Sequence, residues 1–398
     1  MNESSRVGEG RDAPLRVAIV IGTRPEAVKM APVQIACARH PMIEPILIDT
    51  GQHGDLTRPV LEFFGLAAKV DLGCMGEGGV NGLLARAVAR LDEALAALGP
   101  DVVLVHGDTT SALAGALAAF HLRLPVAHVE AGLRTGDPAR PFPEEMNRVL
   151  IDRIAAWHYA PTPGAAAALA AEGRRPASSG GSVLVTGNTA VDALLLGLER
   201  LGPKARPGPQ ARRRILATLH RREGLDGADG GGLAAAARAL ARVAARGDVE
   251  IVLPVHPNPA IGAVLRAGLE GRPGVRLVAP LGYPAFLAEM RAAHLIVTDS
   301  GGIQEEAPSL GVPVLVLREA TERPEAVEAG MARLIGLGEE RIVAECARLL
   351  DDPAAHAGMV AAGNPFGDGA AAPRIAAHLA GLASRPATRA AALNGAAS

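Results

Sequence analysis

The chain is 398 residues long, a length that predicts two or three domains. Apolar residues make up 49% of the sequence and charged residues 21%, so the chain can bury a large core and is not a disordered polypeptide. Lysine and arginine number 40 and aspartate and glutamate 42, which leaves a formal net charge of -2. This balance provides no basic field for a nucleic acid or an anionic membrane, and we expect neither as a partner.

The cysteines and the first residues further limit the class of protein to which the chain can belong. Cys37, Cys74 and Cys346 lie far apart without a C-x-x-C pair, so the sequence favours neither a disulfide framework nor a zinc site. The first residues are polar and lack the apolar stretch of a secretory signal, and no run of about 18 apolar residues could span a bilayer. We therefore expect a soluble, cytoplasmic, globular protein.

Short apolar runs alternate with helical patterns through the first half of the chain. Runs of strand length are separated by segments with the length and spacing of helices, which is typical of βαβ units. Continuous apolar strands of this kind form parallel sheets that helices cover on both faces. The predicted strands span residues 16–21, 44–50, 101–107 and 125–130, and two predicted helices span 26–38 and 83–98.

The same alternation restarts in the second half, after two loops rich in Gly, Pro and Arg at 174–182 and 202–214. Two doubly wound domains that face each other form a cleft, and ligands of such sheets bind at the carboxyl ends of the strands. The sequence therefore predicts an α/β protein with two Rossmann-like, doubly wound domains. The strands predicted in the second half span residues 215–219, 250–255, 275–278, 294–298 and 313–317.

We place the domain boundary at Gly187 and Asn188, which gives an N-terminal domain at 15–187 and a C-terminal domain at 188–364. The polar start at 1–14 is expected to be disordered. The small, polar tail at 386–398 is expected to fray.

The first predicted strand ends in a turn that contains Gly22, Arg24 and Pro25, and a helix follows. Glycine permits a tight turn and proline suits the first helical position, so Arg24 projects beside a helix N-terminus, where a phosphate is favoured. The alternative is an ordinary strand-to-helix turn with a solvated arginine. The turn lacks G-x-G-x-x-G, so no nicotinamide-type fingerprint is present.

Three acidic residues follow strand ends later in the first half. Asp108 comes after one predicted strand and Glu130 after the next, while Glu144 opens a helix behind a proline-rich stretch. Each has a structural explanation, since Asp108 could cap a helix and acids in a first helical turn interact with the helix dipole. Three carboxylates at one cleft would, however, raise the pKa of at least one of them and suit proton transfer.

The second half carries basic residues at its strand ends. His220, followed by Arg221 and Arg222, comes after one predicted strand and could offer cations to a diphosphate. The alternative is a solvated run of charges. His256 follows another strand, where a histidine that packs against the strand end is the more common case.

A glycine-rich motif follows the strand at 294–298. Ser300, Gly301 and Gly302 leave the backbone N–H groups of a helix start open, which suits a phosphate, although a tight turn alone would also explain the glycines. Glu306, one helical turn later, could accept hydrogen bonds from ribose hydroxyls. Arg323 follows the next strand and is expected near the same place.

Taken together, these motifs resemble the non-hydrolysing UDP-N-acetylglucosamine 2-epimerase family. The resemblance keeps the family order and covers about residues 15–380. The motifs that carry it are GTRPEAVKMAP (22–32), TGQH (50–53), HGDTTSALAGA (106–116), HVEAGLRTGD (128–137), FPEEMNR (142–148), GNTAVDALL (187–195), HRRE (220–223) and TDSGGIQEEAPSLGVPVLVLREATERPEAVEAG (298–330).

The resemblance implies two Rossmann-like domains of the glycosyltransferase-B type, with a C-terminal helix at 365–385 that returns to the first domain. It implies reversible interconversion of UDP-GlcNAc and UDP-ManNAc, by elimination of UDP to 2-acetamidoglucal and re-addition with C2 protonated on the other face. No metal or other cofactor is expected, because UDP leaves and returns within the cleft. Members of the family are commonly homodimers, and we expect the same here.

The resemblance also assigns roles to individual positions. Asp108, Glu130, Glu144 and His220 match the catalytic set, with the carboxylates as acid and base candidates and His220 steadying the pyrophosphate as charge develops on it. The positions that match nucleotide-sugar contacts, Phe286 near uracil among them, are Arg24, Lys29, Phe286, Ser300, Gly301, Gly302, Glu306 and Arg323.

Four further positions match residues that bind a second UDP-GlcNAc as activator in bacterial members, namely Gln52, His53, Arg221 and His256. The neighbouring segments 54–56 and 73–82 depart from the family pattern, so allosteric activation stays open. Leu281 stands where a glutamine that contacts uracil is common, which would leave that contact to the backbone.

Other activities stay open beside this one. The same reaction on a related UDP-sugar, such as a 2,3-diacetamido uronic acid, is the nearest alternative, and a hydrolysing epimerase that releases ManNAc is another. A glycosyltransferase would share the fold and the UDP site but would not need three acids around the sugar. A UDP-sugar sensor without activity would not need the intact set of Asp108, Glu130, Glu144 and His220.

Overall fold

The computed structural model describes residues 13–177, 181–203, 212–220, 231–321, 323–361 and 363–383. Of the two segments that we expected to be disordered or frayed, only residues 13 and 14 fall within these ranges. No helix in the described ranges is long and apolar enough to cross a membrane. All three cysteines are buried, free thiols.

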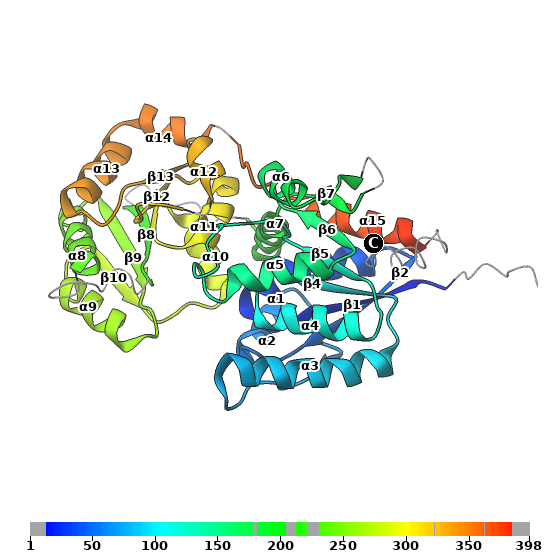
Figure 1. The fold of residues 1–398 in the computed structure, drawn as a ribbon. Helices are drawn as coiled ribbons and strands as arrows, with labels where there is room; N and C mark the ends of the chain where they lie inside the picture. The colour runs from blue at the N-terminus through cyan, green and yellow to red at the C-terminus, as the bar shows by residue number, and fades with distance from the viewer. Residues whose placement is uncertain are drawn as a thin grey trace, which may run out of the picture.

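The first domain is built on a parallel, seven-stranded sheet (Figure 1). Its strand order, β3-β2-β1-β4-β5-β6-β7, places β1 and β4 side by side inside the sheet, and the later strands follow outward on either side. The bounds are β1 (Leu15–Ile21), β2 (Ile43–Asp49), β3 (Val70–Asp71), β4 (Val102–His106), β5 (Val126–Val129), β6 (Trp157–Ala160) and β7 (Val183–Val185).

Helices cover both faces of this sheet. One face carries α1 (Arg24–Ala38), α2 (Arg58–Phe63), α7 (Thr189–Leu201) and α15 (Ala371–Ala383). The other face carries α3 (Gly79–Leu98), α4 (Thr110–His121) and α5 (Glu144–Ile154), and a short 3₁₀ helix, η1 (Gly54–Leu56), follows β2. Near β7 lies α6 (Pro163–Ala171), whose Leu169 packs with Val183 in a small separate cluster.

The second domain has a parallel, six-stranded sheet in the order β10-β9-β8-β11-β12-β13. Its strands are β8 (Arg213–Thr218), β9 (Val249–Pro254), β10 (Val275–Val278), β11 (Leu295–Thr298), β12 (Val314–Val316) and β13 (Ala332–Leu334). One face is covered by α8 (Gly231–Ala244), α9 (Pro259–Leu269), α13 (Glu339–Asp351) and α14 (Pro353–Val360). The other carries α10 (Tyr283–Ala292), α11 (Gly301–Glu306), η5 (Ala307–Leu310) and α12 (Pro324–Glu328).

The hydrophobic core of the first domain continues into the second. Leu194 on α7 and Leu287 on α10 belong to the same buried cluster, which also contains residues of β1, α1 and β12. The helix α15 adds to this connection. It follows the elements of the second domain along the chain but packs against α1, β1 and β2 of the first. The Asp192 carboxylate on α7 accepts hydrogen bonds from the backbone N–H groups of Ala371 and Ala372, at 3.2 and 2.8 Å, and so fixes the start of α15.

Local sequence explains how the central elements form. The strands are apolar runs buried on both faces, as a parallel sheet between two helical layers requires. A capping box starts α1, in which the Thr23 side chain accepts from the Glu26 backbone N–H and the Glu26 carboxylate binds the Thr23 backbone N–H. Gly22 packs so closely against Thr50 and Ser111 that a Cβ atom would lie 2.1 Å from either hydroxyl oxygen.

The predicted fold class is confirmed: the chain forms two parallel-sheet α/β domains. Each strand predicted from an apolar run is present, with ends that differ by no more than two residues. The sequence did not single out β3, β6, β7 and β13.

Candidate active site

The strand order of each sheet marks a place where a ligand is expected to bind. In the first sheet the direction of winding reverses between β1 and β4, and in the second it reverses between β8 and β11. Ligands of open α/β sheets bind outside the carboxyl ends of the strands at such reversal points. The turns that follow these strands contain most of the predicted site residues, among them Arg24, Asp108, His220 and Ser300.

The carboxyl ends of the two sheets face each other, because residues from one edge contact residues from the other. The Arg24 guanidinium, after β1, donates a hydrogen bond to the Leu281 carbonyl, after β10, at 3.2 Å. Lys29 on α1 forms an ion pair with Glu305 on α11, with 3.0 Å between Nζ and Oε2. Two of the predicted residues of the first half, Arg24 and Lys29, therefore contact the second domain directly.

Lys29 is the cation at the centre of this arrangement. Its ammonium group contacts the carboxylate of Glu130 in the first domain as well as that of Glu305 in the second. Glu305 is 1% exposed, and its other oxygen accepts from Nε of Arg323 at 2.8 Å. Burial opposes the charge on Lys29, but the two carboxylates prevail and raise its pKa. Lys29 therefore remains protonated at neutral pH.

Glu130 has a strained backbone conformation at the end of β5. Its φ angle is 63°, in the left-handed region that residues with a side chain seldom adopt, and strain of this kind is concentrated at functional sites. The Arg148 guanidinium on α5 donates to the Glu130 carbonyl oxygen and lies 3.4 Å from the Glu130 Oε1 atom. One arginine thus holds both the backbone and the side chain of Glu130.

The Glu130 carboxylate is buried among positive groups. Burial by itself would raise its pKa, but Lys29 first, and then His106 and Arg148, hold the pKa of Glu130 well below its ordinary value. In this arrangement Glu130 is a carboxylate and can accept a proton only when one of these neighbours moves or is engaged elsewhere.

Asp108 lies in the turn between β4 and α4, opposite Glu130. Its carboxylate accepts from Nη2 of Arg148 at 2.5 Å, so Arg148 bridges Asp108 and Glu130. Its backbone carbonyl accepts from the Asn147 side chain at 2.9 Å. Thr109, rather than Asp108, caps α4, which leaves the Asp108 side chain without the structural role that we considered for it.

Glu144 and Glu145 open α5 and have different environments. Glu145 is buried and accepts hydrogen bonds from the backbone N–H groups of Thr135 and Gly136. Glu144 is partly exposed, and no hydrogen bond or ion pair holds its carboxylate within the described part of the chain. Of the two, Glu144 is therefore the one that is available to a ligand.

A buried histidine connects the three elements that carry these acids. Nδ1 of His128 on β5 lies 2.6 Å from the Asp152 carboxylate on α5, and Nε2 lies 2.7 Å from the Gly107 carbonyl, next to Asp108. Asp152 also accepts from Arg134 at 2.7 Å. The strand ends that carry Asp108 and Glu130 are therefore tied to the helix that begins with Glu144.

In the second domain, an aspartate orients His220. Asp299 accepts from the backbone N–H of His220 at 2.8 Å, and its other oxygen lies 2.6 Å from Nδ1 of the His220 ring. The side chain of His220 is 39% exposed, and its ring stacks on that of His256 with 6.1 Å between centroids. A histidine held through Nδ1 presents Nε2 to a ligand.

The glycine-rich turn lies beneath Arg323. A Cβ atom at Gly301 would lie 2.9 Å from Nη1 of Arg323, so glycine is needed for the guanidinium to lie over the start of α11. Among the described residues, the contacts at Gly302 are limited to the Ser300 hydroxyl, 4.0 Å from where a Cβ atom would lie. The start of α11 therefore presents backbone and a guanidinium group without intervening side chains.

Glu306 follows on the same helix and is an acid with a raised pKa. Burial first, and then the negative charge of Glu305, raise its pKa to about 7, although Lys29 and Arg24 oppose the change. Glu306 therefore titrates near neutral pH in the absence of a ligand.

The remaining predicted residues lie around this centre. Phe286 on α10 is partly buried against the core that the two domains share. Gln52 accepts from the Ser111 hydroxyl at 2.7 Å, and His53 accepts from the backbone N–H of Arg24 at 3.3 Å, so both lie next to the Arg24 turn. The stacking on His220 brings His256 to the same edge, whereas Arg221 lies outside the described residues.

Sequence reasoning did not assign site roles to Glu305 and Arg148, although both are in motifs that it quoted. Each is a buried charged residue that contacts two predicted site residues, Lys29 and Arg323 for Glu305 and Asp108 and Glu130 for Arg148. The available signal was a charged residue on the helix that follows a functional turn. Such a signal does not reveal which of two adjacent acids turns inward.

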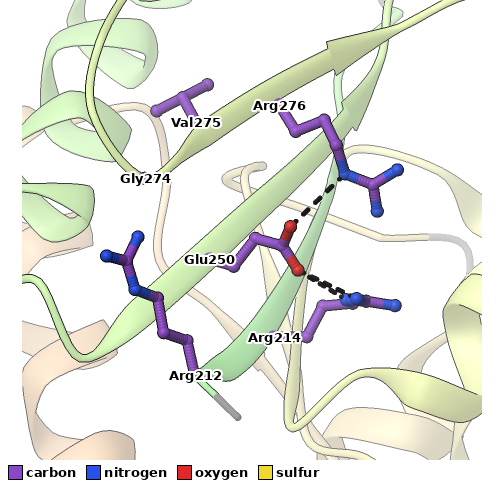
Figure 2. A pocket seen from close by; sticks show the side chains of 6 residues that line it. All are labelled: Arg212, Arg214, Glu250, Gly274, Val275 and Arg276. Carbon is purple, nitrogen blue, oxygen red and sulfur yellow. Dashed lines mark hydrogen bonds and ion pairs between the residues drawn. The ribbon is translucent and has the colours of Figure 1, made fainter. Parts of the chain in front are cut away.

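A hollow at the opposite edge of the second sheet is not part of this arrangement (Figure 2). It lies at the amino-terminal ends of β8, β9 and β10, where Glu250 pairs with Arg214 and Arg276 at 2.9 and 3.4 Å. These ion pairs join neighbouring strands and point to a structural role. Among the described residues, no group of His, Cys, Asp and Glu side chains is arranged to hold a metal ion.

Comparison with known proteins identifies relatives over almost the whole chain. Residues 35–380 match the family model described as UDP-N-acetylglucosamine 2-epimerase. A UDP-N-acetylglucosamine 2-epimerase of Escherichia coli (strain K12) is 44% identical over 373 residues, which cover 91% of this chain and 97% of the relative.

Solved structures agree in fold. The UDP-GlcNAc 2-epimerase from Neisseria meningitidis bound to UDP-GlcNAc aligns with a TM-score of 0.83 and 38% identity, over 92% of this chain and 99% of that one. The glycosyltransferase SnogD from Streptomyces nogalater aligns with a TM-score of 0.58 and 21% identity, over 94% of this chain and 100% of that one. The second likeness concerns the fold alone, which is the glycosyltransferase-B-like pair of domains.

Proposed function

Because the chain belongs to the UDP-N-acetylglucosamine 2-epimerase family, we propose that it interconverts UDP-GlcNAc and UDP-ManNAc reversibly, without hydrolysing the sugar nucleotide. The supporting observation is the position of Lys29, which contacts Glu130 in the first domain and Glu305 in the second. A single cation thus lies between a carboxylate that suits proton transfer and the group of cations that suits a diphosphate.

The chemistry requires both of these features. The C2 proton of the sugar is not adjacent to a carbonyl group, so enolisation is not available. A base instead removes the proton from C2, a double bond forms between C1 and C2, and the bond from C1 to the diphosphate oxygen breaks to release UDP. UDP then adds back to C1 of 2-acetamidoglucal, and C2 receives a proton on the opposite face.

The proton transfers are assigned to the carboxylates of the first domain. Asp108 and Glu130 are bridged by Arg148, so the two carboxylates are held next to each other with one guanidinium between them. Glu144 lies at the start of the helix that carries Arg148, and its carboxylate makes no hydrogen bond or ion pair with the described residues. Three acids at one edge provide a base on one face of the sugar and an acid on the other.

We assign binding of the leaving diphosphate to cations from both domains, together with the backbone N–H groups of Gly301 and Gly302. Arg24 and Lys29 reach across from the first domain, while Arg323 lies over Gly301. His220, held by Asp299, supplies a further donor. Such preorganised donors stabilise the negative charge that develops on UDP as the bond to C1 breaks.

The nucleoside end of the substrate is assigned to the second domain. Glu306 would accept hydrogen bonds from the ribose hydroxyls, and Phe286 would pack near the uracil ring. The Leu281 carbonyl, which accepts from Arg24, lies on the segment between β10 and α10 and offers a backbone contact for the base. In this assignment the first domain provides the acid and base chemistry and two cations for the diphosphate, and the second domain provides the rest of the UDP site.

Product analysis tests the proposal. The protein is incubated with UDP-GlcNAc in one experiment and with UDP-ManNAc in a second, and both are followed by proton NMR. Both should reach the same equilibrium mixture of the two sugar nucleotides. Free ManNAc with stoichiometric UDP would instead indicate the hydrolysing reaction. If UDP-GlcNAc stays unchanged while a UDP-linked 2,3-diacetamido uronic acid is converted, the alternative substrate replaces the one proposed.

A further inference from the structure

His106 ends β4, directly before the turn that carries Asp108, and its imidazole is buried beside the site. The residue is 3% exposed, and neither ring nitrogen makes a hydrogen bond to any described residue. Buried polar groups in folded proteins are nearly always hydrogen-bonded, because losing water without gaining a partner costs free energy. An imidazole left unsatisfied at this position therefore requires an explanation.

The charged groups that face this ring are Glu130, Lys29 and Arg148. Nε2 of His106 lies 3.6 Å from Oε2 of Glu130, slightly beyond a hydrogen bond. Burial lowers the pKa of His106 although Glu130 opposes that change, so the ring is neutral near pH 7 and can donate from one nitrogen only.

Lys29 and His106 compete for the same carboxylate oxygen. Oε2 of Glu130 receives the Lys29 ammonium group, whereas Oε1 lies nearer to Arg148. A bound diphosphate carries more than one negative charge and would compete with the Glu130 carboxylate for Lys29, which Glu305 also contacts. If Lys29 turned to the diphosphate, Oε2 would lose the donor that it has here, while Glu130 would have to stay in place to act on C2.

We propose, on the basis of the function proposed above, that His106 is a positioning residue that donates from Nε2 to Oε2 of Glu130 when Lys29 engages the diphosphate. The shift needed is only the few tenths of an ångström that separate 3.6 Å from hydrogen-bond distance. His106 then fixes the direction of the Glu130 carboxylate during turnover. As a neutral donor it does so without adding the second positive charge that would weaken Glu130 as a base.

The test compares two substitutions of His106 with a matched control. His106→Leu fills a similar volume without a donor, and His106→Gln restores a neutral N–H donor. The control is His378→Leu on α15, which removes a partly buried histidine whose Nδ1 contacts the Tyr159 hydroxyl at 3.0 Å, away from the site. Isothermal titration with UDP and kcat for UDP-GlcNAc from pH 5 to 9 are measured for all four proteins.

Loss of a hydrogen bond to a charged group predicts that His106→Leu lowers kcat by about tenfold or more, while UDP affinity stays within about threefold. The ionisation of Glu130 in the kcat profile should rise by about one pH unit, because the carboxylate loses a donor that favours its charged form. His106→Gln should recover most of kcat and return the ionisation toward that of the wild type. His378→Leu should leave both unchanged.

Two results would overturn the inference. One is a His106→Leu protein whose kcat stays within twofold of the wild type. The other is a loss of kcat that His106→Gln does not restore and that comes without a shift in the pH profile, as expected for a packing role alone. If the wild-type protein itself has no epimerase activity, the function proposed above fails, and this result is distinct from both.

Discussion

Lys29 in the first domain and Glu305 in the second form a buried ion pair, with 3.0 Å between Nζ and Oε2. Glu305 also binds Arg323, and Lys29 also binds Glu130, so a chain of alternating charges runs from one domain to the other. Buried charges are retained only where each has a partner, and this chain satisfies that condition without a ligand. A diphosphate that enters would compete with these carboxylates for the same cations.

Removal of Lys29 should therefore weaken diphosphate binding. We expect Lys29→Met to lower UDP affinity by about 10- to 100-fold, since one charge-assisted contact is lost. Isothermal titration with UDP measures the effect, with Lys69→Met, at an exposed position, as the control. Equal affinity in Lys29→Met and the wild type would remove Lys29 from the proposed diphosphate site.

Substitution of Asp108 should separate binding from chemistry. Asp108→Asn keeps the shape of the side chain but removes the proton-accepting group, and general acid or base catalysis contributes about 10²- to 10⁴-fold. We expect kcat to fall by about that factor while UDP affinity changes by less than about threefold. Asp92→Asn on the exposed side of α3 is the control. Unchanged turnover in Asp108→Asn would refute an acid or base role.

The pKa of about 7 at Glu306 predicts a pH-dependent affinity. Ribose hydroxyls donate to the carboxylate form, so binding should lower the Glu306 pKa and release a proton below pH 7. The affinity for UDP-GlcNAc should then rise as the pH is raised from 5 to about 7 and level off above it. UDP-GlcNAc is the suitable ligand because both of its phosphates stay ionised in this range.

Glu306→Gln provides the comparison for that experiment, because the amide can still accept a hydrogen bond but does not titrate. Its affinity should vary little between pH 5 and 8. If Glu306→Gln shows the same rise with pH as the wild type, the dependence has another origin.

Two stacked histidines in the second domain predict a loss of stability in acid. The rings of His294 and His356 lie 4.1 Å apart, and burial first, and then the neighbouring His356 and Arg213, lower the pKa of His294. A histidine whose folded pKa lies below its unfolded value binds protons more readily after unfolding. The contribution of His294 to the free energy of unfolding is therefore fully present above about pH 6.5, and it decreases as the pH falls below that value.

The prediction is tested by the melting temperature at pH 7.5 and pH 5.5. His356→Gln removes the ring that stacks on His294 and helps to lower the His294 pKa, so its decrease between the two pH values should be smaller than that of the wild type by about 1–3 °C. His121→Gln, at an exposed position on α4, should behave as the wild type. An equal decrease in all three proteins would contradict an effect of the stacked pair.

The sequence allowed the fold to be predicted because its signals are local. Ile19, Val103 and Leu216 lie in apolar runs of strand length, and such runs between helical segments form parallel sheets. Of the four missed strands, β3, β7 and β13 have two or three residues each, too few for a hydrophobic pattern. Their extended form depends on pairing with β2, β6 and β12, which only the assembled sheet provides.

Sequence reasoning could propose candidate site residues mainly where a motif follows a strand end. Arg24, Asp108 and His220 occupy such positions, each just after a strand next to the point where its sheet reverses direction. The contacts of Glu305 and Arg148 could not be predicted, because they join segments far apart in the sequence and depend on which side of a helix faces the site. The left-handed backbone of Glu130 likewise has no signature in its residue type.

The central claim is that the protein breaks and re-forms the bond between C2 and its proton while UDP leaves and returns. Proton NMR of the protein with UDP-GlcNAc in D2O tests it most directly, by following the anomeric and C2 signals. We expect UDP-ManNAc to appear and the C2 proton to be replaced by deuterium in both sugar nucleotides. Retention of the C2 proton in UDP-ManNAc, or no conversion at all, would contradict the account.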